Sequence, residues 1–191
     1  MSEWLQVHEG DAPLIVTMPH VGTEIPASIE PRLLDPWRAR KDADWWIEKL
    51  YALAADLGAT IVRTTISRTV IDLNRDPSGA SLYPGQATTT LCPTDTFDGE
   101  PLYHPGQEPD AAEIAHRRAT WFDPYHAVLR VHIERLRAAH GRVVLYDAHS
   151  IRSAVIHSDG IIDALFGTGL DREVDGVYRK AIDLINASGR P

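Results

Sequence analysis

The fold of this chain is most directly predicted from Val143-Val144-Leu145-Tyr146-Asp147-Ala148-His149-Ser150. An apolar run, partly β-branched, leads without a break into an aspartate, a histidine and a serine. Such a run is typical of a buried strand in a mostly parallel sheet. In open α/β sheets, ligands bind in the crevice outside the carboxyl ends of the strands. The stretch therefore predicts both a sheet and a functional site at its edge.

A second stretch has the same design. Leu14-Ile15-Val16-Thr17-Met18 is predicted to form a strand, and Pro19-His20-Val21-Gly22 follows it directly. A single histidine at a strand end is more often a hydrogen-bonded structural residue than a metal ligand. Two strands that deliver histidines to one edge favour a metal, because catalytic zinc takes about three protein ligands and imidazole is among the commonest.

A carboxylate would complete such a set of ligands. Asp44, at the start of a predicted helix, is the first candidate, and Asp42 and Glu24 are its rivals. Asp44 also has an alternative interpretation as a helix N-cap, since an aspartate there satisfies free backbone N–H groups. The residues alone leave this choice open.

The rest of the chain alternates strands with helices. Apolar residues at helical spacing, aspartates at helix starts and glycines at helix ends define the helices. The predicted helices cover about 44–57, 110–121, 123–140 and 171–188, and the predicted strands cover 14–18, 59–66, 69–73 and 143–147. Residues 78–107 are rich in glycine and proline and are predicted to be a long loop. The alternation predicts a three-layer α/β/α domain with a mostly parallel or mixed central sheet.

Composition and charge exclude several classes of function. The 191 residues suffice for a single domain with its own core. The formal net charge of −8 disfavours nucleic acid as a partner, because phosphate binding needs a basic face. No apolar run approaches the roughly 18 residues of a membrane span. Cys92 is the single cysteine and the N-terminus lacks a signal-peptide pattern, so we expect a cytoplasmic protein. The oligomeric state is left open.

Two arginines and an amide surround an apolar segment in the middle of the chain. They are Arg68, Asn74 and Arg75. The planar guanidinium group suits bidentate recognition of a carboxylate, which indicates a site for an acidic small molecule. The alternative interpretation is an ordinary ion pair with Asp72 or Asp76.

Four segments together form a specific pattern: Met18–Pro26, Asp44-Trp45, Ser67–Arg75 and Tyr146–Ser153. In this order they resemble the N-formylglutamate amidohydrolase (N-formylglutamate deformylase) family, over roughly residues 14–153. That family is related to zinc carboxypeptidases and aminoacyl-glutamate deacylases. The resemblance therefore implies the zinc-dependent exopeptidase (phosphorylase/hydrolase-like) fold and a Zn²⁺ cofactor. It also implies hydrolysis of N-formyl-L-glutamate to L-glutamate and formate, a step of histidine degradation.

The resemblance assigns roles to particular residues. It implies that His20 and His149 are metal ligands. Asp44 is transferred as the third ligand, although relatives often place the acidic ligand nearer the first histidine, which keeps Glu24 as an alternative. Asp147 precedes His149 by two positions, so that it would share one side of an extended strand and could orient the site.

The substrate-binding residues are transferred in the same way. The resemblance implies that Asn74 and Arg75 hold a substrate carboxylate. Arg68 and Arg152 are further cations available to a dianionic substrate.

The chain departs from the family after Ser153. Hydrolases of this type normally use a glutamate from a late strand as general base, and the single glutamate after Glu134 is Glu173, in a predicted helix start. No catalytic base is therefore assigned. We expect residues 1–191 to be one amidohydrolase domain that lacks part of its C-terminal region. The alternative functions are a related N-acyl amino acid deacylase or carboxypeptidase, and a catalytically weak metal-binding or ligand-binding homologue.

Overall fold

The computed structural model describes residues 3–77 and 90–150, which belong to one compact unit, Met1–Ser150. Three predictions lie outside the described residues: the last helix, the position of Arg152, and the extent of the domain at its C-terminus. The expectation of a single domain over residues 1–191 therefore stays a prediction.

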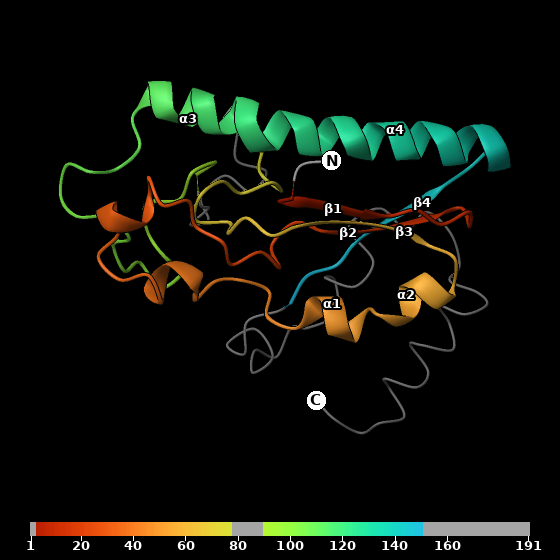
Figure 1. Ribbon diagram of the computed structural model, residues 1–191, viewed down its shortest axis with the longest axis horizontal. Helices are drawn as coiled ribbons and strands as arrows, with labels where there is room; N and C mark the ends of the chain where they lie inside the picture. Colours follow the sequence, from red (N-terminus) through yellow and green to blue (C-terminus); the bar gives the residue numbers. More distant parts are fainter. Residues whose placement is uncertain (1–2, 78–89, 151–191) are drawn as a thin grey trace, which may run out of the picture. The chain divides into compact units, whose positions relative to one another are not determined.

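A mixed four-stranded sheet with the strand order β1-β3-β2-β4 forms the centre of this unit (Figure 1). Its strands are β1 (Leu5–His8), β2 (Leu14–Met18), β3 (Thr60–Thr64) and β4 (Val144–Asp147). β2 pairs in parallel with both β3 and β4, whereas β1 runs antiparallel to β3. The predicted α/β class with a mixed sheet is confirmed.

Helices lie on both faces of the sheet (Figure 1). One face carries α3 (Ala111–Arg117), the π-helical turn η3 (Arg118–Phe122) and α4 (Asp123–His140), and the other carries α1 (Ile47–Leu50) and α2 (Leu53–Asp56). Two short 3₁₀ helices, η1 (Glu30–Arg32) and η2 (Arg38–Arg40), precede α1. Asp110 caps α3 by accepting a hydrogen bond from the backbone N of Glu113 at 2.8 Å. Gly141 ends α4 in the left-handed conformation that favours glycine.

The core has one layer on each face of the sheet, because successive strand residues point to opposite sides. On one side Ile15 and Val62 pack with the buried face of α4, which includes the predicted Tyr125, Leu129 and Leu136. On the other side a smaller cluster contains Val16, Met18, Ile47, Ala54, Ala59 and Ala148. The predicted core-facing side of α4 is therefore confirmed.

The helix predicted over 44–57 is wrong in length and in orientation. It is divided into α1 and α2, and Leu50, Leu53 and Leu57 are 57–67% exposed. Trp46 has a φ of 69°, so the helix begins only after it, at Ile47. The buried residue of α2 is the small Ala54, which lets the backbone of α2 lie close to β3.

Residues 69–73 form a turn and irregular structure instead of the predicted strand. The backbone N of Val70 donates to the carbonyl of Ser67 at 2.9 Å, which bends the chain. Val70, Ile71 and Leu73 are nevertheless buried. The apolar run therefore marks a part of the core that is held by a turn.

β4 is less buried than its sequence predicts. Val144 and Leu145 are 46% and 48% exposed. The reason is topological, because β4 is the last strand in the order and pairs only with β2 among the described strands.

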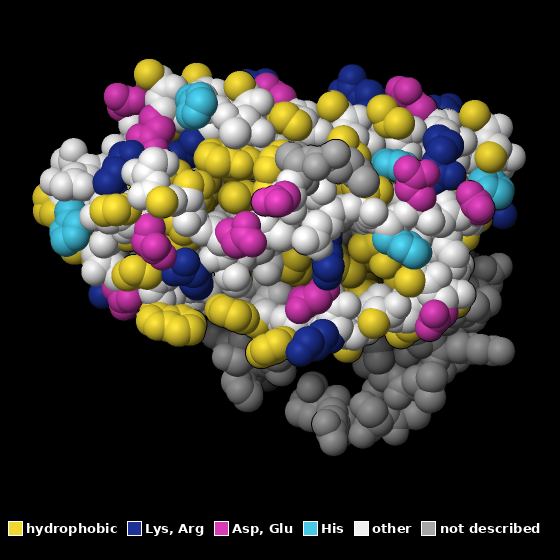
Figure 2. All heavy atoms as spheres, in the orientation of Figure 1, with side chains coloured by type: hydrophobic (Ala, Val, Ile, Leu, Met, Phe, Trp, Pro, Cys, Tyr) yellow, Lys and Arg dark blue, Asp and Glu magenta, His cyan; other side chains and the backbone are white. Residues whose placement is uncertain are grey.

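The described surface gives two further results. Among residues 3–77 and 90–150, no helix is long and apolar enough to cross a membrane. On the face drawn in Figure 2, lysine and arginine side chains are interspersed with acidic ones and form no single basic patch.

Arg117 is a charged side chain buried in the fold, since it is only 1% exposed. It donates to the carbonyl of Val70 at 2.9 Å and to the hydroxyl of Tyr103 at 3.1 Å, and it pairs with Glu113. These contacts join α3 to the turn around residue 70.

We predict that Arg117→Met lowers the free energy of unfolding by at least about 2 kcal/mol, because each buried polar partner left unsatisfied costs about 1–3 kcal/mol. Arg118→Met is the matched control. Its partner Asp123 is exposed, and exposed pairs contribute about 0–1 kcal/mol. Chemical denaturation compares the two variants, and equal small losses would contradict the structural role of Arg117.

Candidate metal centre

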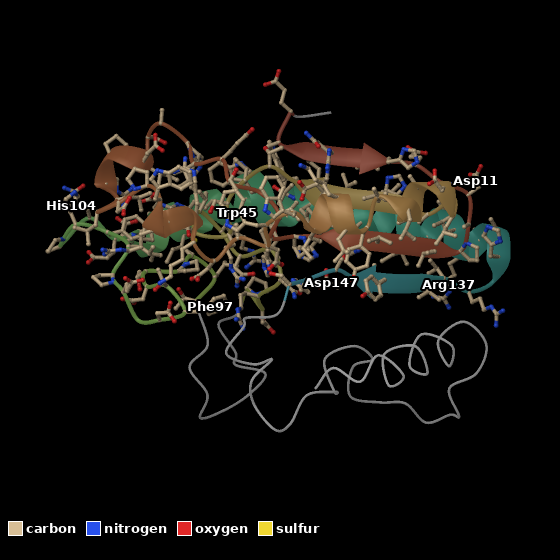
Figure 3. The ribbon with its side chains drawn as sticks, turned by 90° about the horizontal axis from the view of Figure 1, so that it is seen from below. Asp11, Trp45, Phe97, His104, Arg137 and Asp147 are labelled. Atoms are coloured by element: carbon tan, nitrogen blue, oxygen red, sulfur yellow. The ribbon has the colours of Figure 1, made fainter. Side chains whose placement is uncertain are left out.

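The two histidines and the aspartate that were predicted as metal ligands lie together. His20 follows β2 and His149 follows β4, at the carboxyl ends of two paired parallel strands. Asp44 lies beside them, with its backbone N donating to the carbonyl of His20 at 2.9 Å. One donor atom from each of the three side chains lies within 4.8 Å of the others. In Figure 3, Asp147 marks this end of the sheet and Asp11, which precedes β2, marks the opposite end.

His20 presents one ring nitrogen to a carboxylate outside this group. Its Nε2 lies 2.6 Å from Oδ1 of Asp72, and because a carboxylate only accepts, Nε2 carries the proton. Its Nδ1 faces Oδ2 of Asp44 at 3.7 Å and lies 3.4 Å from Nη1 of Arg68. The guanidinium can only donate, so Nδ1 presents a lone pair, which is the form that binds a metal.

His149 is arranged in the same way. Its Nε2 lies 2.9 Å from Oδ2 of Asp147, and its Nδ1 lies 3.1 Å from Oδ2 of Asp44. Burial disfavours a charged imidazole, but the two carboxylates outweigh it and raise the pKa of His149 to about 9. The amide of Asn74 also lies 3.1 Å from Nε2. Without a metal, His149 is therefore protonated at neutral pH.

Asp44 lies between the two histidines and is 5% exposed. Burial alone would raise the pKa of its carboxyl group, but hydrogen bonds from His149 and Ser150 and the neighbouring ring of His20 lower it below the ordinary value. The hydroxyl of Ser150 donates to Oδ1 at 2.6 Å. The alternative interpretation as an N-cap does not apply, since α1 begins after Trp46 and has no side-chain cap.

The two rival carboxylates have other partners. Glu24 accepts a hydrogen bond from the hydroxyl of Thr65 at 2.7 Å, and Asp42 accepts one from the backbone N of Phe97 at 2.8 Å. Neither belongs to the group of close donor atoms found among the described residues.

Asp72 is a residue of the site that the sequence pattern identified only as a possible ion-pair partner. It is fully buried and accepts hydrogen bonds from Nη2 of Arg68 at 2.5 Å and from the backbone N of Asn74 at 3.0 Å, besides that from His20. Burial would raise the pKa of its carboxyl group, but these cationic and hydrogen-bonding partners lower it. Nε of Arg75 lies 3.6 Å from Oδ2 of Asp72. The ion pairs with Asp72 that were the alternative for Arg68 and Arg75 are therefore present.

The donor set fits a catalytic metal site. Two imidazole nitrogens and one carboxylate oxygen are the protein ligands of catalytic zinc in thermolysin and carboxypeptidase A. Metal-binding histidines usually donate their other N–H to a carboxylate or carbonyl, which fixes the tautomer and the ring orientation. Both histidines here have such a carboxylate, Asp72 for His20 and Asp147 for His149.

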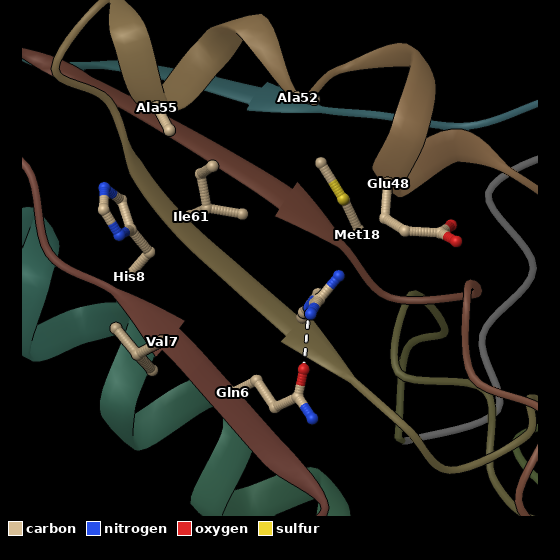
Figure 4. Close-up of a pocket in the computed structure, with 9 residues that line it drawn as sticks. Gln6, Val7, His8, Met18, Glu48, Ala52, Ala55 and Ile61 are labelled. Atoms are coloured by element: carbon tan, nitrogen blue, oxygen red, sulfur yellow. Dashed lines mark hydrogen bonds between the residues drawn. The ribbon is translucent and has the colours of Figure 1, made fainter.

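A separate pocket of about 300 Å³ lies between the sheet and the helices α1 and α2 (Figure 4). Its lining residues are Gln6, Val7, His8, Met18, Glu48, Ala52, Ala55, Ile61 and Arg63. Nε of Arg63 donates to the side chain of Gln6 at 2.8 Å across it. None of the predicted site residues lines this pocket, so the chemistry is argued from the histidine group alone.

Sequence comparisons give the family of the chain. The N-formylglutamate amidohydrolase family matches residues 12–187. N-formylglutamate deformylase from Pseudomonas putida is 42% identical over 157 residues, which are 82% of this chain and 58% of that protein. N-formylglutamate deformylase from Pseudomonas aeruginosa is 38% identical over 190 residues, which are 98% of this chain and 71% of that protein. The likeness thus extends past Ser153, where the motifs alone had ended.

A solved structure of the same family is also similar to this chain. The crystal structure of N-formylglutamate amidohydrolase from Ralstonia eutropha JMP134 superposes with a TM-score of 0.63 at 26% identity, and the match covers 78% of this chain and 57% of that one. The chain therefore spans 58% of the length of the Pseudomonas putida relative and 57% of the Ralstonia chain. On the family match and these identities, the chain belongs to the N-formylglutamate amidohydrolase family.

Proposed function

We propose that the protein hydrolyses N-formyl-L-glutamate to L-glutamate and formate, with a Zn²⁺ ion bound by His20, Asp44 and His149. The observation that carries this proposal is the convergence of their donor atoms within 4.8 Å. The names of the relatives suggest the substrate, and a metal ion held by the two histidines and Asp44 would activate water.

The side chains around the centre have distinct tasks. A bound zinc would supply a water whose pKa falls from about 15.7 towards 7 and would polarise the formyl oxygen. Asp72 and Asp147 hold the two imidazole rings in position, and Ser150 fixes one oxygen of Asp44 so that the other faces the histidines. The site is therefore preorganised by hydrogen bonds before any metal binds.

The substrate carboxylates need cationic partners beside the centre. We assign Arg75 and Asn74 to this task, since Asn74 lies next to His149 and the side chain of Arg75 is 27% exposed. The side chain of Arg68 is 8% exposed, and its guanidinium pairs with Asp72 and lies over the ring of Phe97, with Cζ 4.5 Å from the ring centroid. Arg68 thus contributes positive charge to the site through its pair with Asp72.

The same arrangement supports the finer classification of the fold. The parallel strands β2 and β4 bring His20 and His149 to their carboxyl ends, where open α/β sheets bind their ligands. We therefore propose that the chain has the zinc-dependent exopeptidase-like fold.

Formate release from N-formylglutamate is the direct test. The purified chain is stripped of metal with a chelator and then assayed with and without added Zn²⁺. The proposal expects activity that depends on zinc and is lost in Asp44→Asn. A chain that binds zinc but releases no formate would refute the activity and leave the metal site standing.

We predict that His20→Ala and His149→Ala each abolish tight Zn²⁺ binding, because each removes one of three protein ligands. His104→Ala is the control, since His104 is exposed and lies far from Asp147 in Figure 3. Elemental analysis of the purified variants measures the bound metal. Asp44→Asn should weaken binding strongly and Glu24→Gln should not, and the reverse result would make Glu24 the third ligand.

The affinity for zinc should rise with pH. The pKa of His149 is raised to about 9, so its Nδ1 carries a proton at pH 7 that the metal must displace. Below pH 9 the apparent affinity should therefore fall as pH falls, by up to about tenfold for each pH unit from this group. Calorimetric titration in buffers of different ionisation enthalpy counts the released protons. Zinc binding without proton release at pH 7 would contradict the assignment of His149.

Arg75→Ala should lower kcat/KM for N-formylglutamate by about 10- to 150-fold, since a hydrogen bond to a charged group contributes roughly 1.5–3 kcal/mol. The loss should shrink for a substrate analogue without the α-carboxylate, because the partner of the guanidinium is then absent. Steady-state kinetics with both substrates makes the comparison. An equal loss on both would mean that Arg75 acts only through the fold, for example through Asp72.

A further inference from the structure

Thr17 and Asp147 face each other across the pairing of β2 with β4. The hydroxyl of Thr17 donates to Oδ1 of Asp147 at 2.5 Å, and Thr17 is 3% exposed. This contact connects the sheet interior to a carboxylate at its edge.

The carboxylate of Asp147 is shared between two partners. Oδ1 accepts from Thr17, and Oδ2 contacts Nε2 of His149 at 2.9 Å. Because the two oxygens belong to one rigid group, holding Oδ1 also fixes the direction in which Oδ2 points. The position of the imidazole therefore depends on the threonine hydroxyl.

The two orienting carboxylates of the centre differ in how they are held. Asp72 has no exposed side-chain surface, and it is fixed by Arg68 and by the backbone N of Asn74. The side chain of Asp147 is 36% exposed and would rotate into solvent at little cost without its partner. The threonine hydroxyl is thus the partner that holds Asp147 from the side opposite His149.

Tyr125 of α4 lies close to this pair from within the core. The pKa of its phenol is raised, first by burial and then by the negative charge of Asp147, and Thr17 acts in the opposite direction. The phenol therefore stays protonated, and its hydroxyl is buried without a hydrogen-bond partner among the described residues.

From this geometry we propose that Thr17 is a positioning residue for the metal centre, which acts on His149 through the carboxylate of Asp147. The inference rests on the proposed metal site and goes beyond it, because Thr17 belongs to the interior of the sheet and contacts neither the metal-binding atoms nor the substrate clamp.

The test compares the Zn²⁺ affinity of three variants by competition with a chromophoric chelator. Thr17→Val keeps the shape of the side chain and removes the hydroxyl, and it should weaken Zn²⁺ binding by about 10- to 100-fold, the usual effect of losing an outer partner of a metal ligand. Thr17→Ser restores the donor and should restore the affinity. Thr60→Val is the matched control, because Thr60 is a buried threonine of the neighbouring strand whose hydroxyl bonds to Gly10.

Thermal unfolding separates positioning from a general loss of stability. Thr60→Val should be destabilised and bind Zn²⁺ as the wild type does. The absorption spectrum of bound Co²⁺ should change in Thr17→Val and not in Thr60→Val. The double variant Thr17→Val/Asp147→Asn should bind Zn²⁺ little more weakly than Asp147→Asn alone, since Thr17 acts on His149 only through the carboxylate of Asp147.

Wild-type affinity in Thr17→Val, or an equal loss in Thr60→Val, would overturn the inference and leave the proposed function intact. Should Thr17→Val fail to fold, the Zn²⁺ affinity of Asp147→Asn decides, because this variant preserves Thr17 and its packing. An unchanged Zn²⁺ affinity in Asp147→Asn overturns the inference as well. If the wild-type protein bound no Zn²⁺, the proposed metal site would fail first and the inference with it.

Discussion

The parallel pairing of β2 with β4 is the constraint on which the site depends. Its register sets Thr17 opposite Asp147, so the chain leaves both strands at one edge and presents His20 and His149 within 4.8 Å of Asp44. A slip of one residue would turn every side chain of a strand to the other face and separate the two rings. The packing of α4 against β2 holds this register from one side, and the smaller cluster around Ile47 and Ala54 supports it from the other.

Buried charge gives the centre its chemical character. Three carboxylates lie around two imidazoles at the edge of an apolar core, where an unpaired charge would be costly. Each has partners: Asp72 has His20 and Arg68, Asp44 has both histidines and Ser150, and the more exposed Asp147 has Thr17 and His149. Three carboxylates in one place also favour the binding of a further cation. A metal ion would relieve the repulsion among the carboxylates, and in its absence a proton on His149 does so.

Elements of the fold that have a local sequence pattern were predictable, and elements that depend on tertiary contacts were not. β2 and β4 were predictable because each is a short, continuous apolar run, and α4 because its apolar residues recur at helical spacing. The four residues of β1 are too few to establish a period, and the turn around Val70 is buried by tertiary contacts that no local pattern expresses. The exposure of Leu50 could not be foreseen, since the backbone reversal at Trp46 sets the rotation of α1 and α2. The candidate ligands were found because strand-end histidines give a local signal, whereas the part played by Asp72 depends on the fold.

The central claim is that one metal ion is bound by two imidazoles and one carboxylate. X-ray absorption at the zinc edge of the reconstituted protein tests it most directly, because imidazole rings give a characteristic outer-shell scattering that can be counted. The account predicts one zinc per chain, two imidazole ligands, light-atom distances of about 2.0–2.2 Å and no sulfur at about 2.3 Å. A zinc bound through the single cysteine, Cys92, or one with fewer than two imidazoles, would contradict it.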